Sequence, residues 1–401
     1  MTPYATVALD LSAAAPPRAK LRRLLSIDLL RGLTITFMIL VNNNGDGRRA
    51  YWPLQHAAWN GFTPTDLVFP TFLFLVGIST VFSLSARIAA GVSRNSLFLH
   101  TLRRAAILFV LGLVVNSFPH FNPHTLRVFG VLPRIALCYL LVATLYLISS
   151  EWRSKAVIVC VALIGYWALM RFVPVPGYGV PTHTVPLLDH DGNLTAWLDR
   201  HIFSAPHLYE RTRDPEGFLS TLPALATALI GLLTGEWLRT ERSVAEKSRG
   251  ILTAGLSAVL LGGLWNFTFP INKKLWTSSF VLFAAGWSLL LLTLSIAIAD
   301  IREETPHVAP PEQHRTPVFM TVLLVFGMNA IASYVLSELL QSTISSIHLH
   351  PGLNVQQWLY RSILALVSNP ALASLLYSLA FVAVCWIPMF VLYRKRVFIK
   401  I

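Results

Sequence analysis

Long apolar runs separated by shorter polar segments make up most of this chain. Eight of ten such runs hold 18 or more residues, close to the roughly 20 that an α-helix needs to cross about 30 Å of hydrocarbon. We therefore predict an all-α, polytopic integral membrane protein with about ten transmembrane helices. The third and seventh runs are short enough to be partly re-entrant. The spans are expected near Leu24–Asn42, Leu67–Ala89, Arg104–Phe118, Val128–Ser149, Ala156–Val173, Leu219–Leu238, Gly250–Asn266, Thr277–Ala299, Pro317–Leu340 and Ala371–Tyr393.

The composition agrees with this pattern. Apolar residues make up 54% of the chain and charged residues only 13%, with a mean hydropathy of +0.59. The net charge of +13 is spread over the loop ends, without the basic stripe that nucleic-acid binding requires. Cys138, Cys160 and Cys385 fall inside predicted spans, so we interpret them as packing residues and expect neither a disulfide framework nor a metal site.

The distribution of lysine and arginine predicts the orientation. With a cytoplasmic N-terminus, about twice as many of these residues fall in inner segments as in outer ones, as the positive-inside rule requires. No small-residue cleavage site follows the first run, which we interpret as a retained helix. We predict cytoplasmic tails at 1–23 and 394–401, a transmembrane domain at 24–393, and periplasmic loops at 43–66, 174–218 and 341–370.

The loop between the first two runs carries the main candidate chemistry. His56 lies in it, with Asn42 before it and Asp66 at its end. Ionisable groups at a membrane boundary usually face a cavity, and a neutral imidazole can act as a general base. Asp66 could fix its tautomer, and the amide of Asn42 or Asn60 could donate to a developing oxyanion. The alternative is that His56 and the nearby tryptophans form an interfacial belt without chemistry.

Several polar residues lie inside predicted spans. Asp28 and Arg31 are three residues apart, on one face of the first helix, either as a structural ion pair or at the entrance of a ligand channel. Asn329 and Glu338 lie on the ninth span, where Asn329 either hydrogen-bonds between helices or lines a site. A buried Arg134 needs a carboxylate or phosphate partner.

Short motifs occur in order along most of the chain: Asp28-x-x-Arg-Gly32, Asn42, His56-Ala-Ala-Trp-Asn-Gly61, Asp66-Leu-Val-Phe-Pro70, Arg127-x-x-Gly-Val-Leu-Pro-Arg134, Asp214-Pro-Glu-Gly217 and Pro270-Ile-Asn-Lys-x-Leu-Trp-Thr-Ser-Ser279. Together they resemble the heparan-α-glucosaminide N-acetyltransferase family and its bacterial inner-membrane relatives. The resemblance implies transfer of acetyl from cytoplasmic acetyl-CoA to the amine of a terminal glucosamine across the membrane. It also implies that His56 is catalytic, with Asn42 and Asp66 beside it.

Further site residues follow from the resemblance and from the chemistry of the donor. The anionic end of CoA stays at the cytoplasmic face, and arginine suits phosphates. We expect Arg103 and Arg104 there, with Arg31 and its neighbour Asp28 next, and ordinary positive-inside anchoring as the alternative. Acceptor contacts are expected from Trp59, Asn60, Arg134, Glu216, Lys273 and Asn329.

We expect no counterpart of the long luminal N-terminal region of the lysosomal member of this family. We therefore expect a bacterial inner-membrane enzyme that acts on glucosamine or a cell-wall-derived amino sugar, with a homodimer as a possible assembly. Two other functions stay open. One is a membrane O-acyltransferase acting on polysaccharide, and the other is an amino-sugar transporter, which would need no thioester.

Overall fold

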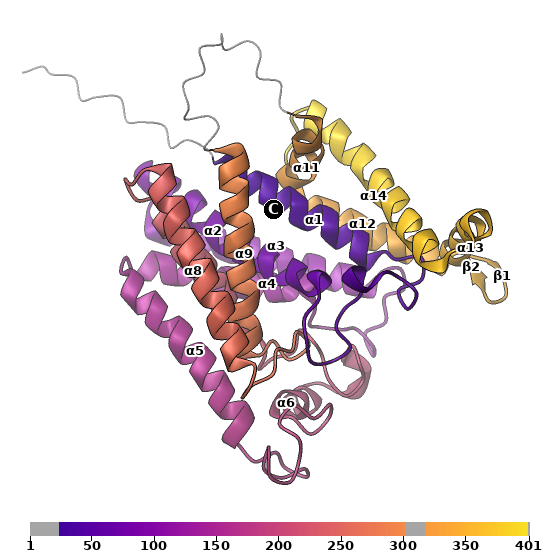
Figure 1. Ribbon diagram of the computed structural model, residues 1–401, viewed down its shortest axis with the longest axis horizontal. Coiled ribbons are helices and arrows are strands. Elements are labelled where there is room, and N and C mark those ends of the chain that lie inside the picture. The colour runs from indigo at the N-terminus through magenta and orange to yellow at the C-terminus, as the bar shows by residue number, and fades with distance from the viewer. Residues whose placement is uncertain (1–23, 301–316, 400–401) are drawn as a thin grey trace, which may run out of the picture.

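The computed structural model describes residues 24–300 and 317–399, and almost all of its regular structure is helical (Figure 1). The predicted 1–23 tail lies outside the described residues. The long helices are α1 Leu25–Asn42, α2 Val68–Ala89, α3 Arg94–Ser117, α4 Val131–Ile148, α5 Trp152–Phe172, α7 Thr221–Leu238, α8 Val244–Trp265, α9 Ser278–Ala299, α11 Val318–Met328, α12 Ala330–Ser346 and α14 Pro370–Arg394. The shorter elements are α6 Leu194–Ile202, α13 Val355–Val367, the 3-10 turns Trp52–Leu54, Pro64–Leu67 and Ala205–His207, and the strands β1 His348–His350 and β2 Leu353–Asn354.

The predicted all-α membrane fold is confirmed. Within the described ranges, nine helices are long and apolar enough to cross a membrane, or ten if the bent pair α11 and α12 counts as one span. The third and seventh predicted spans were wrong in length, because α3 and α8 are full-length helices of 24 and 22 residues. Both begin before the apolar run. Ser93 and Ser243 cap their N-termini. The first turns of both helices are polar, so the apolar run alone predicts helices that are too short.

The ninth predicted span is also corrected. Its two halves, α11 and α12, meet at an angle of 82°. Asn329 at the junction has non-helical backbone angles, and its side chain bonds the backbone of the C-terminal segment at Val397 O (3.2 Å) and Ile399 N (2.8 Å). Those bonds satisfy the side-chain amide of Asn329 and two backbone groups of the C-terminal segment at the break between the helices.

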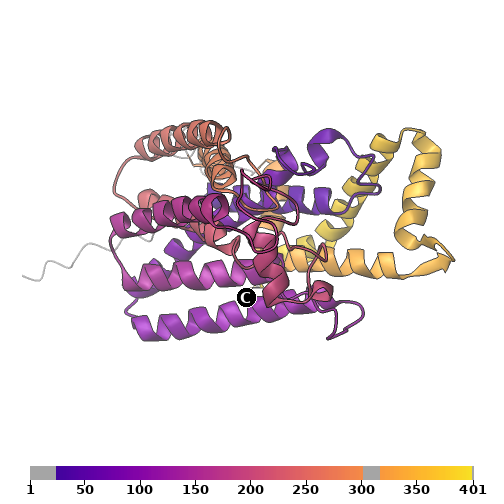
Figure 2. The ribbon, with the colours of Figure 1, turned by 90° about the horizontal axis from the view of Figure 1, so that it is seen from below.

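Glycines let helix backbones approach closely within the bundle. A Cβ on Gly77 of α2 would lie 2.0 Å from the carbonyl oxygen of Ala228, and one on Gly231 of α7 would lie 2.0 Å from that of Phe74. In the same way, Gly32 of α1 packs against the backbone of α11. Small residues at helix contacts are the usual basis of packing in membranes, where apolar surface alone drives little association. Figure 2 shows the C-terminal helices at one edge of the molecule.

The connections that follow α1, α3, α5 and α8 meet at one end of the bundle, which we call the pocket end. The connection 173–220 contains the short helix α6. This connection lies against the α1–α2 loop, because Trp59 stacks on His190 with ring centroids 3.9 Å apart and donates to Leu188 O at 2.8 Å. The pocket end therefore has several layers of loop above the helix ends.

Candidate active site

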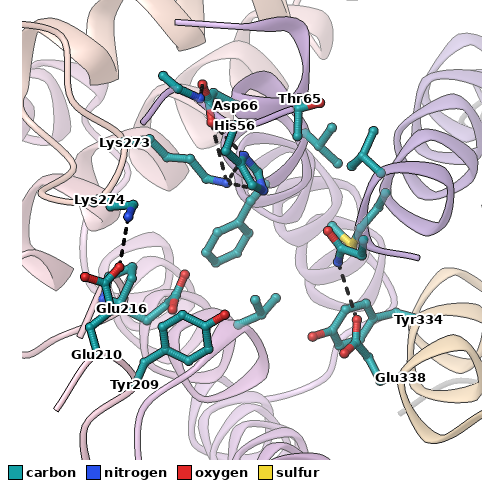
Figure 3. A pocket seen from close by; sticks show the side chains of 18 of the residues that line it. His56, Thr65, Asp66, Tyr209, Glu210, Glu216, Lys273, Lys274, Tyr334 and Glu338 are labelled. Atoms are coloured by element: carbon teal, nitrogen blue, oxygen red, sulfur yellow. Dashed lines mark hydrogen bonds and ion pairs between the residues drawn. The ribbon is translucent and has the colours of Figure 1, made fainter. Parts of the chain in front are cut away.

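A polar cavity of about 660 Å³ lies at the pocket end (Figure 3). Its walls come from the last turns of α1 and α3, the first turns of α2 and α4, the middle of α12, and four loops. Apolar residues such as Met38, Phe69 and Val115 also line it. The polar lining comprises Asn42, His56, Thr65, Asp66, Asn116, Arg127, Tyr209, Glu210, Glu216, Lys273, Lys274, Tyr334 and Glu338.

His56 and Asp66 form the first group of the pocket. His56 Nδ1 lies 2.7 Å from Asp66 Oδ1. Asp66 is only 1% exposed and its other oxygen accepts from the backbone N–H groups of Ala57 and Thr63, both at 3.1 Å. This follows from the local sequence, because Thr63 and Asp66 form a capping box on the turn that begins at Pro64. Backbone groups of the same loop therefore hold the carboxylate in place, independently of its contact with the imidazole.

Lys273 lies against the same imidazole. Its Nζ is 3.0 Å from Nδ1 and 3.4 Å from Nε2 of His56, and 3.8 Å from Asp66 Oδ1. Burial lowers the pKa of His56, the hydrogen bond to Asp66 opposes this, and the charge of Lys273 lowers it again. The net shift is downward, so the ring is neutral near pH 7. Burial also lowers the pKa of Lys273.

Arg127 is the centre of a second group. Its guanidinium holds Asp214 through two hydrogen bonds of 2.7 and 2.6 Å and also contacts Glu216. Burial alone lowers the pKa of Arg127, but the two carboxylates raise it above its usual value. Nearby, Glu210 binds Lys274 at 2.9 Å. These pairs attach the connection 173–220 to the α3–α4 loop and to the segment before α9.

Glu338 and Tyr334 form a third group on α12, across the pocket from His56 (Figure 3). The Asn42 amide donates to Glu338 Oε1 at 3.4 Å, which connects the end of α1 to α12. Sequence reasoning placed Glu338 on a span without giving it a role, and it missed Tyr334. No local pattern marks these residues, since they reach the pocket only through the bend at Asn329.

Among the expected site residues, the structure brings Asn42, His56, Asp66, Glu216 and Lys273 to the pocket. It gives the other expected acceptor contacts structural partners. Trp59 packs against the 173–220 connection, as described above. The side-chain oxygen Oδ1 of Asn60 accepts from Asn272 Nδ2 at 3.1 Å, which joins the α1–α2 and α8–α9 loops. Asn329 binds the C-terminal segment.

Over residues 24–300 and 317–399, which the structure describes, Arg134 has no carboxylate partner, contrary to expectation. It is fully buried, donates to Gly217 O at 3.1 Å and to the Ser220 hydroxyl, and lies 5.1 Å from the Trp276 ring centre. Arg127 lies in the loop before α4, whereas Arg134 lies in the first turn of that helix. Arg134 instead holds the turn that carries Glu216.

The arginines expected at CoA lie outside the pocket lining. Arg31 contacts Asp28 at 2.9 Å and the Ser79 hydroxyl at 2.8 Å, within the helix bundle. On α3, Arg103 is exposed and Arg104 lies 4.9 Å from the ring centre of Tyr139. None of them is brought together with His56.

Other pocket residues were missed because their roles depend on distant partners. Asn116, at the end of α3, donates to the carbonyls of Arg127 (3.0 Å) and Phe129 (2.7 Å), and so shapes the α3–α4 loop. From the sequence, Lys274 had no predicted site role. Its position beside Lys273 in the Pro270–Ser279 motif was the one available signal.

Comparison with known proteins identifies the family of this chain. The family model described as heparan-alpha-glucosaminide N-acetyltransferase, catalytic, matches residues 23–263. The proteins named heparan-alpha-glucosaminide N-acetyltransferase from Mus musculus and Homo sapiens are both 27% identical to this chain, over 81% and 82% of it. The chain spans about half the length of these curated relatives, 55% and 54%. The matched region contains His56, Asp66 and Arg127, and the chain belongs to the heparan-α-glucosaminide N-acetyltransferase family.

Proposed function

We propose that this protein transfers the acetyl group of acetyl-CoA to the amine of glucosamine or a related amino sugar. The observation that carries the proposal is the His56–Asp66 pair, which presents a neutral imidazole to a cavity of about 660 Å³ in a member of this family. The cavity is in the usual size range of small-molecule sites. Its mixed polar and apolar lining suits a sugar beside a thioester.

His56 is the proposed general base. Its Nε2 takes a proton from the acceptor nitrogen as that nitrogen attacks the thioester carbonyl. The new C–N bond forms, the C–S bond breaks, and the CoA thiolate leaves and recovers the proton from the imidazolium. Asp66, bound to Nδ1, keeps the reactive tautomer and stabilises the imidazolium.

Lys273 is proposed to stabilise the negative charge that develops on the thioester oxygen. Its ammonium lies within 3.4 Å of both ring nitrogens of His56, so it is already beside the reacting atoms. Preorganised cations and donors of this kind supply much of the rate enhancement in acyl transfer. Asn42 also lines the pocket, whereas Asn60 is engaged with Asn272 outside it, which favours Asn42 as a second donor.

The CoA phosphates are proposed to bind at the opposite end of the bundle, where Arg103 is exposed beside Arg104 on α3. The pocket lining does not reach them. The thioester therefore needs a passage to open past the apolar residues Met38, Phe69 and Val115, which line the deep side of the pocket. We further propose that the pocket end is periplasmic, in a bacterial inner membrane, and that both termini are cytoplasmic.

The test is to mix detergent-purified protein with labelled acetyl-CoA and glucosamine and to follow the label. The proposal expects labelled N-acetylglucosamine and free CoA from the wild type, and neither from folded His56→Ala. Label on a hydroxyl of a polysaccharide, with none on glucosamine, would favour an O-acyltransferase. Uptake of glucosamine into vesicles without release of CoA would favour a transporter.

A further inference from the structure

Glu338 differs from the other carboxylates of the pocket in its electrostatic partners. Asp66 lies beside His56 and Lys273, Glu216 binds Arg127, and Glu210 binds Lys274. Among the residues that the structure describes, no lysine, arginine or histidine lies within ion-pair distance of Glu338. Its one hydrogen bond there comes from the Asn42 amide, at a long 3.4 Å.

Within the described residues, the neighbouring Tyr334 also has a polar group without a hydrogen-bond partner. It lies one turn before Glu338 on α12, is 7% exposed, and lines the same cavity. In the described part of the chain, its hydroxyl makes no hydrogen bond, and Oε2 of Glu338 makes none either. A half-buried carboxylate without a cation is costly. A bound cation with N–H donors would remove that cost.

We propose that Glu338 and Tyr334 form a second subsite, which binds a further ammonium group of the acceptor. The acceptor class is then an oligosaccharide with more than one free amine. This inference rests on the proposed function. While one amine reacts at His56, a second amine on the next sugar binds Glu338 on the opposite wall (Figure 3).

Size and charge favour this occupant over the donor. The cavity of about 660 Å³ is in the range that encloses a drug-sized ligand, which exceeds a single hexosamine. The pantetheine arm of CoA has amides and a hydroxyl but no positive charge, so it does not compensate a carboxylate. An amino sugar does, because its ammonium can make a charge-assisted hydrogen bond.

The experiment compares three acceptors with purified protein: glucosamine, a disaccharide of two glucosamine units, and the same disaccharide with its reducing-end amine acetylated. The wild type is expected to favour the diamine over the monoamine disaccharide by about tenfold or more in kcat/KM, as for one charged hydrogen bond. Glu338→Gln should reduce that ratio to about one, through KM. Glu210→Gln, an identical change at a carboxylate already paired with Lys274, should keep it.

Binding without donor gives a second readout, by equilibrium dialysis of the labelled diamine disaccharide. Wild type should bind it about tenfold more tightly than Glu338→Gln does. Equal ratios in the wild type and in Glu338→Gln would overturn the inference while leaving glucosamine acetylation intact. So would a Glu338→Gln effect confined to the KM of acetyl-CoA, which would assign the subsite to the donor. Transfer to none of the acceptors would instead overturn the proposed function, and this inference with it.

Discussion

Ionisable side chains occur at both ends of the helix bundle, but their surroundings differ. At the end opposite the pocket, Arg31 contacts Asp28 inside the bundle, and Lys155 of α5, which is fully buried, is paired with Glu236 of α7. Each of these charged groups has an oppositely charged partner inside the protein. At the pocket end, the His56 side chain is 45% exposed and presents a ring nitrogen to a cavity.

This difference separates structural from chemical roles better than residue type does. Both ends hold charged groups that a hydropathy pattern would mark as exceptional in a membrane protein. A buried ion pair adds little net stability to the fold. Removing one partner is nevertheless destabilising, because the other charge is left buried and unpaired. A group that keeps a free lone pair toward a cavity can act on a ligand. Substitutions at the two ends should therefore affect different measurements.

The largest expected effect is at His56. His56→Ala should lower acetyl transfer by about 100- to 10,000-fold, because the acceptor nitrogen loses its general base. Labelled acetyl transfer to glucosamine measures this. An unchanged size-exclusion profile and melting temperature would show that the fold is retained. If the variant kept wild-type activity, His56 would belong to an interfacial belt and the contrast between the two ends would fail.

Asp66→Asn should follow, with a loss of about 100-fold or more in kcat, because an amide neither fixes the Nδ1–H tautomer nor stabilises the imidazolium. The substitution preserves the shape of a residue that is 1% exposed. Thr63→Ala is the matched control, since it removes one hydroxyl contact to the same carboxylate but leaves both backbone N–H donors, and it should cost less than about tenfold. Equal losses in both variants would indicate that Asp66 acts only through the local fold.

At the opposite end, Lys155→Met should lower stability by about 1–3 kcal/mol, because Glu236 loses its cation in a mostly buried setting. The melting temperature in detergent measures this loss. Transfer activity per folded molecule should stay at the wild-type level. The double variant Lys155→Met, Glu236→Gln should regain part of the stability. A Lys155→Met protein that melts normally but has lost activity would contradict the structural role.

The smallest expected effect is a shift in the pH profile. Activity needs the neutral imidazole, so it is present above the pKa of His56 and is lost as the pH falls through it. Lys273 lowers that pKa by its charge. Lys273→Met should therefore raise the pKa of His56 and move the acid limb of kcat/KM to higher pH. This shift comes in addition to the loss of rate expected from removing the charge beside the thioester oxygen. Lys274→Met removes a cation that is paired with Glu210, so it should leave the acid limb in place. An acid limb that does not move in either variant would show that Lys273 does not lower the pKa of His56.

Some of the site could be predicted because its parts are close in sequence. His56 and Asp66 are ten residues apart across one loop, and the capping signal Thr63-Pro-Thr-Asp66 positions the carboxylate locally. Trp59 and Asn60 belong to the same loop, yet they point to scaffold contacts at Leu188 and Asn272. Nothing in the residue order distinguishes a loop side chain that faces a ligand from one that fixes the loop.

Residue order was enough to predict a helical membrane fold of about ten spans and an ionisable loop between the first two, because hydropathy and capping are local properties of the chain. Tertiary structure alone placed Lys273 on the His56 ring, brought Glu338 to the opposite wall, and assigned Arg134 to a structural role. The physical reason is that a buried polar group takes whatever partner its neighbours offer. In this fold those neighbours come from helices and loops hundreds of residues away.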